Sequence, residues 1–231
     1  MSYDFNGSSQ YASGSSTLLT DEPIDMFACG YSDTVAAQQA AVNLGHSGAT
    51  SGQYKLYWDG TSASDPIYAQ KQNDAGTQTG NSNSIGFTAS TWYRSSASFI
   101  SDTSRASYIN GGTKSTNTTS VADPTPDYVT VGARRTSAVA EYFDGKLHGA
   151  VIASANGSDT VHAGFGKGIS PLSNIPLASI RGWYPMLVDV NNHVTTTGNY
   201  PNLTLTGSPS LSTTNDPLCG YPRIGSRMTL G

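Results

Sequence analysis

Hydrophobic and polar residues alternate along the chain in short runs. Between residues 127 and 133, for example, Val129 and Val131 alternate with Tyr128 and Thr130. Because successive side chains of a strand point to opposite faces, this period of two places both valines on one buried side. The pattern therefore predicts short strands with one face in a core.

Turn-forming dipeptides separate these runs. Four Asn-Gly and Asp-Gly pairs lie beside such runs: Asn6-Gly7, Asp59-Gly60, Asn110-Gly111 and Asp144-Gly145. Such pairs readily adopt the positive φ angles of type I′ turns, so they favour hairpins of antiparallel strands. We expect the last pair to join a strand at 140–143 to one at 146–153. The other predicted strands are 2–5, 9–12, 24–31, 38–44, 53–58, 66–71, 84–88, 91–100, 105–109, 127–133, 181–190 and 202–206.

Two segments depart from this pattern. Residues 35–43 read VAAQQAAVN, whose composition favours a helix, although their place between two predicted strands allows a strand. Residues 156–164 have room for one short helical turn, with Asn156 or Ser158 as its N-cap. The remainder of the chain offers little helical signal.

The composition supports an all-β fold. Ser and Thr together make up 58 of the 231 residues, alongside 25 Gly and only 2 Glu. These residues favour strands, turns and caps over helix interiors, whereas 13 Tyr, 6 Phe and 3 Trp supply material for a core. We predict an antiparallel sandwich that forms a single domain over residues 1–231. Its Pro-containing segment 170–231 is expected to wrap around the sandwich as an extension.

The charge distribution excludes several classes of function. The net charge is −4, only 12% of residues are charged, and no basic run occurs, which argues against a nucleic-acid surface. No stretch approaches the roughly 20 apolar residues of a membrane span. The first residues show neither a basic nor an apolar signal-peptide region, so we expect synthesis in a cytoplasm.

The chain has two cysteines, Cys29 and Cys219. Two cysteines alone cannot hold a metal or build a disulfide framework. We expect two small buried thiols rather than a disulfide.

Several short motifs follow one another in a fixed order between Tyr3 and Pro209. They are Tyr3-Asp4-Phe5-Asn6-Gly7, Thr91-Trp92-Tyr93, Tyr108-Ile109-Asn110-Gly111, Tyr142-Phe143-Asp144-Gly145, Gly168-Ile169-Ser170-Pro171, Trp183-Tyr184-Pro185-Met186 and Leu203-Thr204-Leu205-Thr206-Gly207-Ser208-Pro209. This order resembles the laminin-G-like jelly-roll domains of the concanavalin A-like lectin and glucanase superfamily. The last three motifs resemble the ending of such domains in bacteriophage structural proteins. The resemblance implies a jelly-roll sandwich.

The resemblance also implies a role on a virus particle. We expect a non-enzymatic bacteriophage virion protein, made in the host cytoplasm, that decorates the capsid or forms a tail or fibre appendage. Its partners would be the major capsid protein or tail components and further copies of itself in a homo-oligomer. A host surface glycan is a further candidate partner. The alternatives are a stand-alone glycan-binding lectin and, behind it, a glucanase-like hydrolase, since the fold does not fix the function.

Catalytic patterns are missing from the sequence. Glycoside hydrolysis needs two carboxylates about 5–10 Å apart, and the glucanase pattern Glu-x-Asp-x-x-Glu does not occur around Glu22 or Glu141. The segment from Gly45 to Ala49 departs from the Gly-x-Ser-x-Gly nucleophile motif at its last position. We therefore expect no enzymatic activity.

Binding residues can be nominated more readily. Sugar sites combine an exposed aromatic ring with nearby polar groups, and Tyr31, Tyr68 and Tyr200 lie in or near predicted loops. No cofactor is expected, but a calcium ion is left open, because several relatives of the resembled family bind calcium at the sandwich rim. The residues nominated as its ligands are Asp21, Glu22, Asp25 and Asp102.

Overall fold

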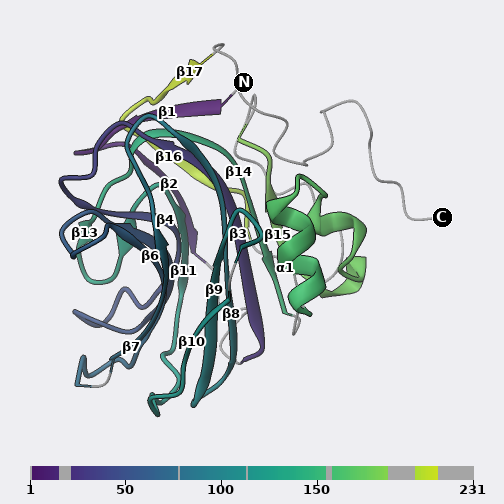
Figure 1. The fold of residues 1–231 in the computed structure, drawn as a ribbon. Helices are drawn as coiled ribbons and strands as arrows, with labels where there is room; N and C mark the ends of the chain where they lie inside the picture. The colour runs from purple at the N-terminus through teal and green to yellow at the C-terminus, as the bar shows by residue number, and fades with distance from the viewer. Residues whose placement is uncertain are drawn as a thin grey trace.

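Two antiparallel β-sheets stacked face to face make up most of the molecule (Figure 1). The computed structural model describes residues 2–15, 22–77, 79–112, 114–154, 158–186 and 201–212. The strands are β1 (Ser2–Asn6), β2 (Tyr11–Ser15), β3 (Ile24–Ser32), β4 (Gln38–Gly45), β5 (Gln53–Asp59), β6 (Pro66–Gln72), β7 (Thr79–Gly86), β8 (Trp92–Ser101), β9 (Ser104–Ile109), β10 (Ser115–Asn117), β11 (Tyr128–Val131), β12 (Arg134–Arg135), β13 (Val139–Ala140), β14 (Asp144–Ala153), β15 (Ile180–Tyr184), β16 (Thr204–Thr206) and β17 (Ser210–Ser212). The helices are α1 (Asp159–Gly166) and two short 3₁₀ turns, η1 (Pro171–Ser173) and η2 (Leu177–Ser179).

The strand order interleaves distant parts of the chain. The eight-stranded sheet runs β10-β9-β8-β3-β14-β1-β17, with β15 paired to the far half of β14. The seven-stranded sheet runs β16-β2-β11-β4-β5-β6-β7, and β12 and β13 form a separate two-stranded ribbon. This is the predicted two-sheet antiparallel jelly-roll sandwich, and the expectation of an all-β fold is confirmed.

The main hydrophobic core lies between the two sheets, with Trp58 near its centre. The indole of Trp58 is fully buried, and its centroid lies 5.1 Å from that of Phe87 and 5.2 Å from that of Phe143. Its Nε1–H donates a hydrogen bond to Ser95 Oγ at 3.3 Å. Tryptophan thus fills the core while its one polar atom keeps a partner.

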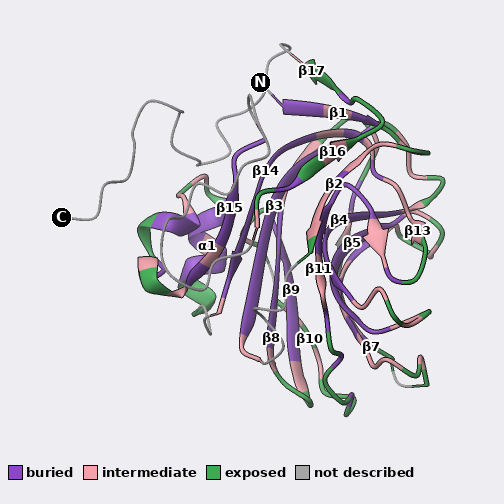
Figure 2. Ribbon diagram, turned by 180° about the vertical axis from the view of Figure 1, so that it is seen from behind, coloured by how far each residue is buried: buried purple, intermediate pink, exposed green. Residues whose placement is uncertain are grey.

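A second, smaller cluster lies under α1 on the outer face of the eight-stranded sheet, as the buried residues of that helix in Figure 2 indicate. Phe165 of α1 contacts Phe27 of β3 edge-on, with centroids 5.4 Å apart. His162 of the same helix is fully buried between the rings of Phe27 and Tyr108, at 4.9 and 4.2 Å. Its Nδ1 lies 2.9 Å from Ser96 Oγ. The helix is therefore held on the sheet by stacked rings as well as by aliphatic packing.

Local predictions were correct in part. Residues 38–45 form β4, so the strand alternative for the 35–43 segment is confirmed. The predicted short helical turn is the two-turn α1, whose N-cap is Ser158, although the Ser158 side chain makes no capping hydrogen bond. The Asp144-Gly145 hairpin is wrong: both residues belong to β14, and Gly145 pairs with Phe5 of β1. A dipeptide suited to a turn can also lie in a strand when neighbouring strands on both sides pair with it, as β1 and β3 pair with Gly145.

The expectation of two free cysteines is wrong as well. Cys29 is fully buried and disulfide-bonded. Cys219, the only other cysteine of the chain, lies outside the described residues. A disulfide depends on which residues the tertiary fold brings together, and the local pattern around Cys29 does not reveal that.

The described parts of the C-terminal segment contribute strands to both sheets. β15 and β17 pair with β14 and β1 of the eight-stranded sheet, whereas β16 pairs with β2 of the seven-stranded sheet. Among the described residues, no helix is long and apolar enough to cross a lipid bilayer.

Candidate functional site

The outer face of the seven-stranded sheet carries polar and aromatic side chains of β5, which are buried, and of β6, which are in part exposed. Along β5, Leu56 and Trp58 belong to the core, so the alternating residues Lys55 and Tyr57 point the opposite way. Figures 1 and 2 show that this sheet curves and that β13 lies on its hollow side. The outer face is therefore a curved surface, partly covered by the β12–β13 ribbon.

A row of carboxamides crosses this face from β4 to β7; we call it the amide row. Its members are Asn43, Gln53, Gln70, Gln72 and Asn81. Gln53 Oε1 accepts a hydrogen bond from Asn43 Nδ2 at 3.2 Å, and Gln53 Nε2 donates to Gln70 Oε1 at 3.0 Å. Gln53 Nε2 also lies 3.2 Å from Gln72 Oε1, and Gln70 Nε2 donates to Asn81 Oδ1 at 2.9 Å. A carboxamide has two donors and two lone pairs, so the half-exposed members keep capacity directed towards solvent.

Two tyrosines and a buried ion pair lie beside the amide row. The rings of Tyr57 and Tyr68 are 4.9 Å apart, and Lys55 Nζ lies 3.8 Å from the centroid of Tyr57. Lys55 is 2% exposed and pairs with Glu141, which also lies 3.2 Å from Arg134 Nε. Burial lowers the pKa of Lys55 to about 8, against the opposing effect of Glu141.

The β12–β13 ribbon is fixed to the same face by backbone and side-chain contacts. The N–H of Arg135 donates to Asn43 Oδ1 at 2.9 Å, and the Arg135 guanidinium lies 3.7 Å from the ring of Tyr128. The N–H of Ser137 donates to the carbonyl of Ala49 at 2.8 Å. The ribbon therefore adds two arginines, Arg134 and Arg135, to one side of the amide row.

This arrangement is suited to polyhydroxylated ligands. The partly exposed ring of Tyr68 offers an apolar face for a sugar ring, whereas Tyr57 is buried behind it. Carboxamides and guanidinium groups offer fixed donors and acceptors for hydroxyl groups. Because the amides already bond to one another, their orientations are set before a ligand arrives, which lowers the entropic cost of binding.

The nominated tyrosines do not come together. Tyr68 lies on the outer face beside the amide row, partly exposed. Tyr31 lies on the opposite side of the sandwich, where its ring contacts Trp92 at 5.5 Å and Lys146 at 4.6 Å. Tyr200 lies outside the described residues. Tyr68 and Tyr31 therefore remain separate predictions, on opposite sides of the sandwich.

The amide row itself was missed, although a signal for it exists. Gln70 and Gln72 are two positions apart in β6, and Asn43 interrupts the apolar run of β4. A period of two in carboxamides predicts a polar face as clearly as a period of two in valines predicts a core.

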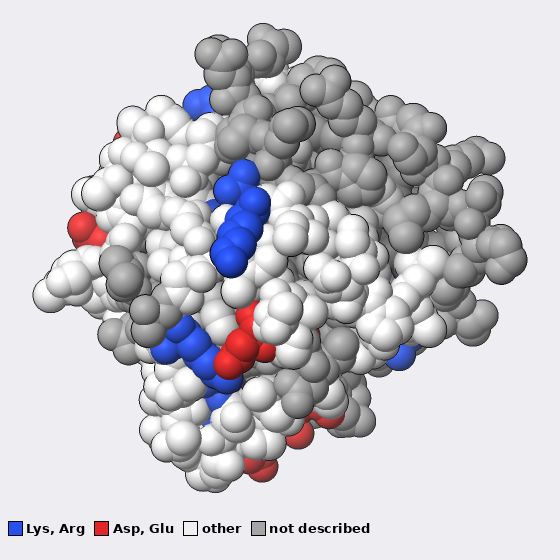
Figure 3. Space-filling view, turned by 45° about the vertical axis from the view of Figure 1, so that its right-hand side comes forward, with Lys and Arg blue, Asp and Glu red and all other residues white. Residues whose placement is uncertain are grey.

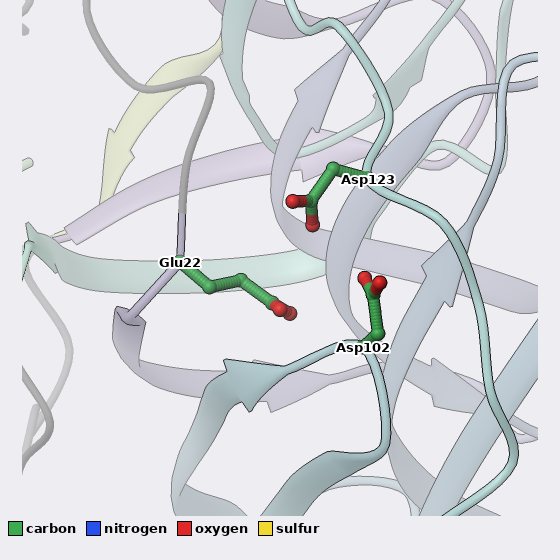
Figure 4. A group of neighbouring side chains, drawn as sticks. All are labelled: Glu22, Asp102 and Asp123. Carbon is green, nitrogen blue, oxygen red and sulfur yellow. The ribbon is translucent and has the colours of Figure 1, made fainter.

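A second group of polar residues lies at the rim of the sandwich, where three carboxylates point towards one another (Figure 4). Glu22 precedes β3, Asp102 lies in the β8–β9 turn and Asp123 lies in the connection between β10 and β11. Lys71 of β6 is fully buried, and its Nζ lies 2.7 Å from Asp102, 2.7 Å from Asp123 and 3.1 Å from Glu22. Tyr54 donates its hydroxyl hydrogen to Asp123 at 2.6 Å. We call Lys71 and the three carboxylates the rim cluster.

A pocket opens beside the rim cluster. Its volume is about 410 Å³, and it is lined by Glu22, Ile100, Ser101, Asp102, Thr103 and Asp123. The Glu22 side chain is only 6% exposed, and its Oε1 has no hydrogen-bond partner. Burial raises the pKa of Glu22 from 4.5 to about 7, which the nearby Lys71 counteracts only in part.

Of the nominated calcium ligands, the structure brings two together. Glu22 and Asp102 both belong to the rim cluster. Asp25 is fully buried on β3, where it lies 3.5 Å from His162 Nε2 and is not a member of the rim cluster. Asp21 lies outside the described residues. Asp123, the third member, was missed because nothing local distinguishes it from other loop acids.

The rim cluster predicts a pH-dependent stability. Because folding raises the pKa of Glu22, this residue favours the folded state fully below about pH 4.5, and that contribution is lost as the pH rises through about 7. Glu22→Gln mimics the protonated form. Between pH 4.5 and 8, the unfolding free energy of the wild type should fall by about 2 kcal/mol more than that of the variant. Urea denaturation across this range measures the difference, and parallel curves for the two proteins would contradict the expectation.

Charge is sparse among the described residues of the face that carries α1. Figure 3 shows the side of the molecule that carries α1, where a few separate blue and red patches interrupt a largely uncharged surface. Both signs occur there, so the described part of this face carries no extended patch of a single charge.

The described sandwich is similar in structure to several solved proteins. A putative carbohydrate-binding protein from Bacteroides ovatus matches with a TM-score of 0.63 and 13% identity, over 95% of this chain and 61% of that one. The CBM40 of the Ruminococcus gnavus IT-sialidase matches with a TM-score of 0.55 and 13% identity, over 71% of this chain and 96% of that one. The enzymatically active domain of tailspike protein 2 from bacteriophage CBA120 matches with a TM-score of 0.51 and 13% identity, over 74% of this chain and 27% of that one.

The fold is that of the concanavalin A-like, laminin-G-like jelly rolls. No protein-family model and no curated protein sequence matches the chain. At these low identities the likeness establishes the fold alone, and the function of this jelly roll has to be argued from its own residues.

Proposed function

We propose that this jelly-roll protein is a non-enzymatic carbohydrate-binding module, and that its ligand lies across the amide row on the outer face of the seven-stranded sheet. The observation that carries the proposal is the row itself: five carboxamides from four adjacent strands, bonded in series beside a pair of tyrosines. The Bacteroides ovatus and CBM40 neighbours share the fold, and carbohydrate binding is part of the first protein's description.

The carboxylates on this face support binding rather than hydrolysis. Glu141 is held by Lys55 and Arg134. Asp59 accepts hydrogen bonds from the hydroxyls of Thr61 and Ser62, and these bonds lower its pKa although burial opposes them. A glycosidase needs one carboxylic acid that keeps its proton, and an aspartate with a lowered pKa does not provide it.

A glycan array with the purified protein tests the proposal, followed by affinity measurements on the best ligand. Tyr68→Ala should weaken binding about tenfold, because a stacked ring contributes roughly 1–1.5 kcal/mol. Tyr31→Ala is the matched control: it removes the same side chain from the opposite side of the sandwich and should leave the affinity within about twofold. The proposal would be contradicted if no glycan bound on the array with or without calcium, or if Tyr31→Ala lost affinity and Tyr68→Ala did not.

The glucanase-like alternative is tested by a separate assay on the same purified protein. A polysaccharide panel is assayed for released reducing sugar, and no release is expected. The rim cluster contains the carboxylate whose pKa is raised to about 7, Glu22, so it is the position to test. Release that Glu22→Gln abolishes would overturn the non-enzymatic part of the proposal.

We further propose that the module belongs to a bacteriophage particle, as a capsid decoration protein or a tail or fibre appendage. The motifs at 168–171, 183–186 and 203–209 support this role, and the tailspike domain among the structural neighbours is compatible with it. The partners would be major capsid or tail proteins and other copies of the chain. Mass spectrometry of sedimented particles should detect the protein at a stoichiometric level. Its absence from particles, while it is abundant in the lysate, would refute the virion role.

A further inference from the structure

The rim cluster has the composition of a cation site, and the calcium that the fold family implies would have to bind there. Calcium requires six to eight oxygen ligands at 2.3–2.6 Å. One oxygen from each of Glu22, Asp102 and Asp123 lies within 4.8 Å of the other two, so their negative charges converge on one point. Carboxylate oxygens are suitable ligands for calcium, but the point on which they converge is occupied by the ammonium of Lys71.

Lys71 provides the positive charge at that centre. Along β6, Ile67 and Ala69 face the core between the sheets, and Lys71 follows them on the same side, at the end of the core. Its ammonium has three donors, and three carboxylates accept them at 2.7, 2.7 and 3.1 Å. Each of the three carboxylates therefore has one oxygen in contact with the ammonium.

The four residues also link separate parts of the fold. Lys71 comes from the seven-stranded sheet, Asp102 from the turn between two strands of the other sheet, and Glu22 and Asp123 from two further connections. Bound metal ions commonly link loops in this way. A lysine that is fully buried and bonded in this position does the same without a metal.

We infer that the ammonium of Lys71 is the resident cation of this rim and that the protein has no calcium requirement there. The residues do not fit a calcium ion while Lys71 is present, because the ion and the ammonium would compete for the same three carboxylates. The two positive charges would also lie close enough to repel each other. The unpartnered, buried Oε1 of Glu22 adds a corollary. Without the lysine, the three carboxylates, this oxygen among them, would form a latent site for a divalent cation.

Calcium and its luminescent substitute terbium test the inference on the full chain. For the wild type, the melting temperature should be the same in EDTA and in millimolar calcium, and terbium should give no saturable luminescence. Lys71→Ala should melt several degrees lower in EDTA. It should recover part of this loss in calcium and gain terbium luminescence, which the nearby Tyr54 would sensitise. Lys114→Ala, which removes a lysine from the exposed pair with Asp159, is the matched control and should gain neither response.

A second variant keeps the test decisive if Lys71→Ala does not fold. Asp102 is 54% exposed, so Asp102→Asn should be tolerated. If Lys71 is the resident cation, this variant should lower the melting temperature equally in EDTA and in calcium. A wild type that calcium stabilises saturably, with the effect lost in Asp102→Asn, would overturn the inference. The inference would also be overturned if folded Lys71→Ala protein showed neither a rise in melting temperature with calcium nor terbium luminescence.

Discussion

Glu141→Gln should lower the unfolding free energy by about 3 kcal/mol at pH 6. Lys55 is 2% exposed, and its charge is balanced by Glu141, so the substitution leaves a buried ammonium without its counter-ion. The same change also removes the charge that faces Arg134. The loss should be visible by chemical denaturation and should be accompanied by detachment of the β12–β13 ribbon.

The sign of the pH dependence follows from Lys55. Burial lowers its pKa to about 8 in the folded protein, from an ordinary value of 10.5. Its contribution to stability is therefore present above about pH 10.5 and is lost as the pH falls through 8. Since Lys55 in the folded protein loses its charge as the pH rises above about 8, the difference in unfolding free energy between the wild type and Glu141→Gln should narrow between pH 6 and pH 10.

The variant Lys55→Met tests whether the instability of Glu141→Gln comes from an unbalanced buried charge or from the loss of a side-chain contact. Methionine has a similar length and no charge, so this variant should lie within about 1 kcal/mol of the wild type or be more stable. The double variant Lys55→Met/Glu141→Gln should lie close to Lys55→Met, because the glutamate no longer has a buried charge to balance. If Glu141→Gln alone proved as stable as Lys55→Met, the ion pair would not have the role assigned to it.

The alternation of core residues made the fold predictable. Val129 and Val131 lie in the core as their spacing indicated, and residues 38–45 form a strand despite a composition that favours a helix. Burial between neighbouring strands outweighs local propensity in that segment. Gly145 is a second example, since its local signal for a turn is outweighed by pairing with Phe5.

The candidate sites were less predictable, because both depend on contacts between distant residues. Glu22 and Asp102 were nominated from their loops, but Asp123 and the buried Lys71 complete the rim cluster through ion pairs across the sequence. No local pattern marks a lysine as the partner of three acids. On the outer face, Tyr68 was nominated as a loop aromatic but lies within β6. The carboxamides beside it were overlooked, although their spacing was informative.

Gly45→Ala should displace the β12–β13 ribbon and abolish binding at the outer face. Gly45 ends β4, and the main chain of Arg135 passes so close that a Cβ on Gly45 would overlap the carbonyl oxygen of Arg135. The obstacle is backbone, which cannot rotate away as a flexible side chain can. The ribbon must therefore move, and the bond from the Arg135 N–H to Asn43 is lost with it. We expect a cost of about 3 kcal/mol and at least a tenfold loss of glycan affinity.

Gly164→Ala is the matched control, since it adds the same methyl group where space exists. A Cβ at this position of α1 would lie 3.7 Å from the nearest side chain, Ile169, which is an ordinary van der Waals distance. Alanine is also a better helix former than glycine by about 1 kcal/mol, so the control should be neutral or stabilising. Its glycan affinity should be unchanged, because α1 lies on the opposite sheet. Equal stability of the two variants would mean that the ribbon does not depend on Gly45. A destabilised Gly45→Ala protein with intact affinity would instead place the ligand away from the amide row.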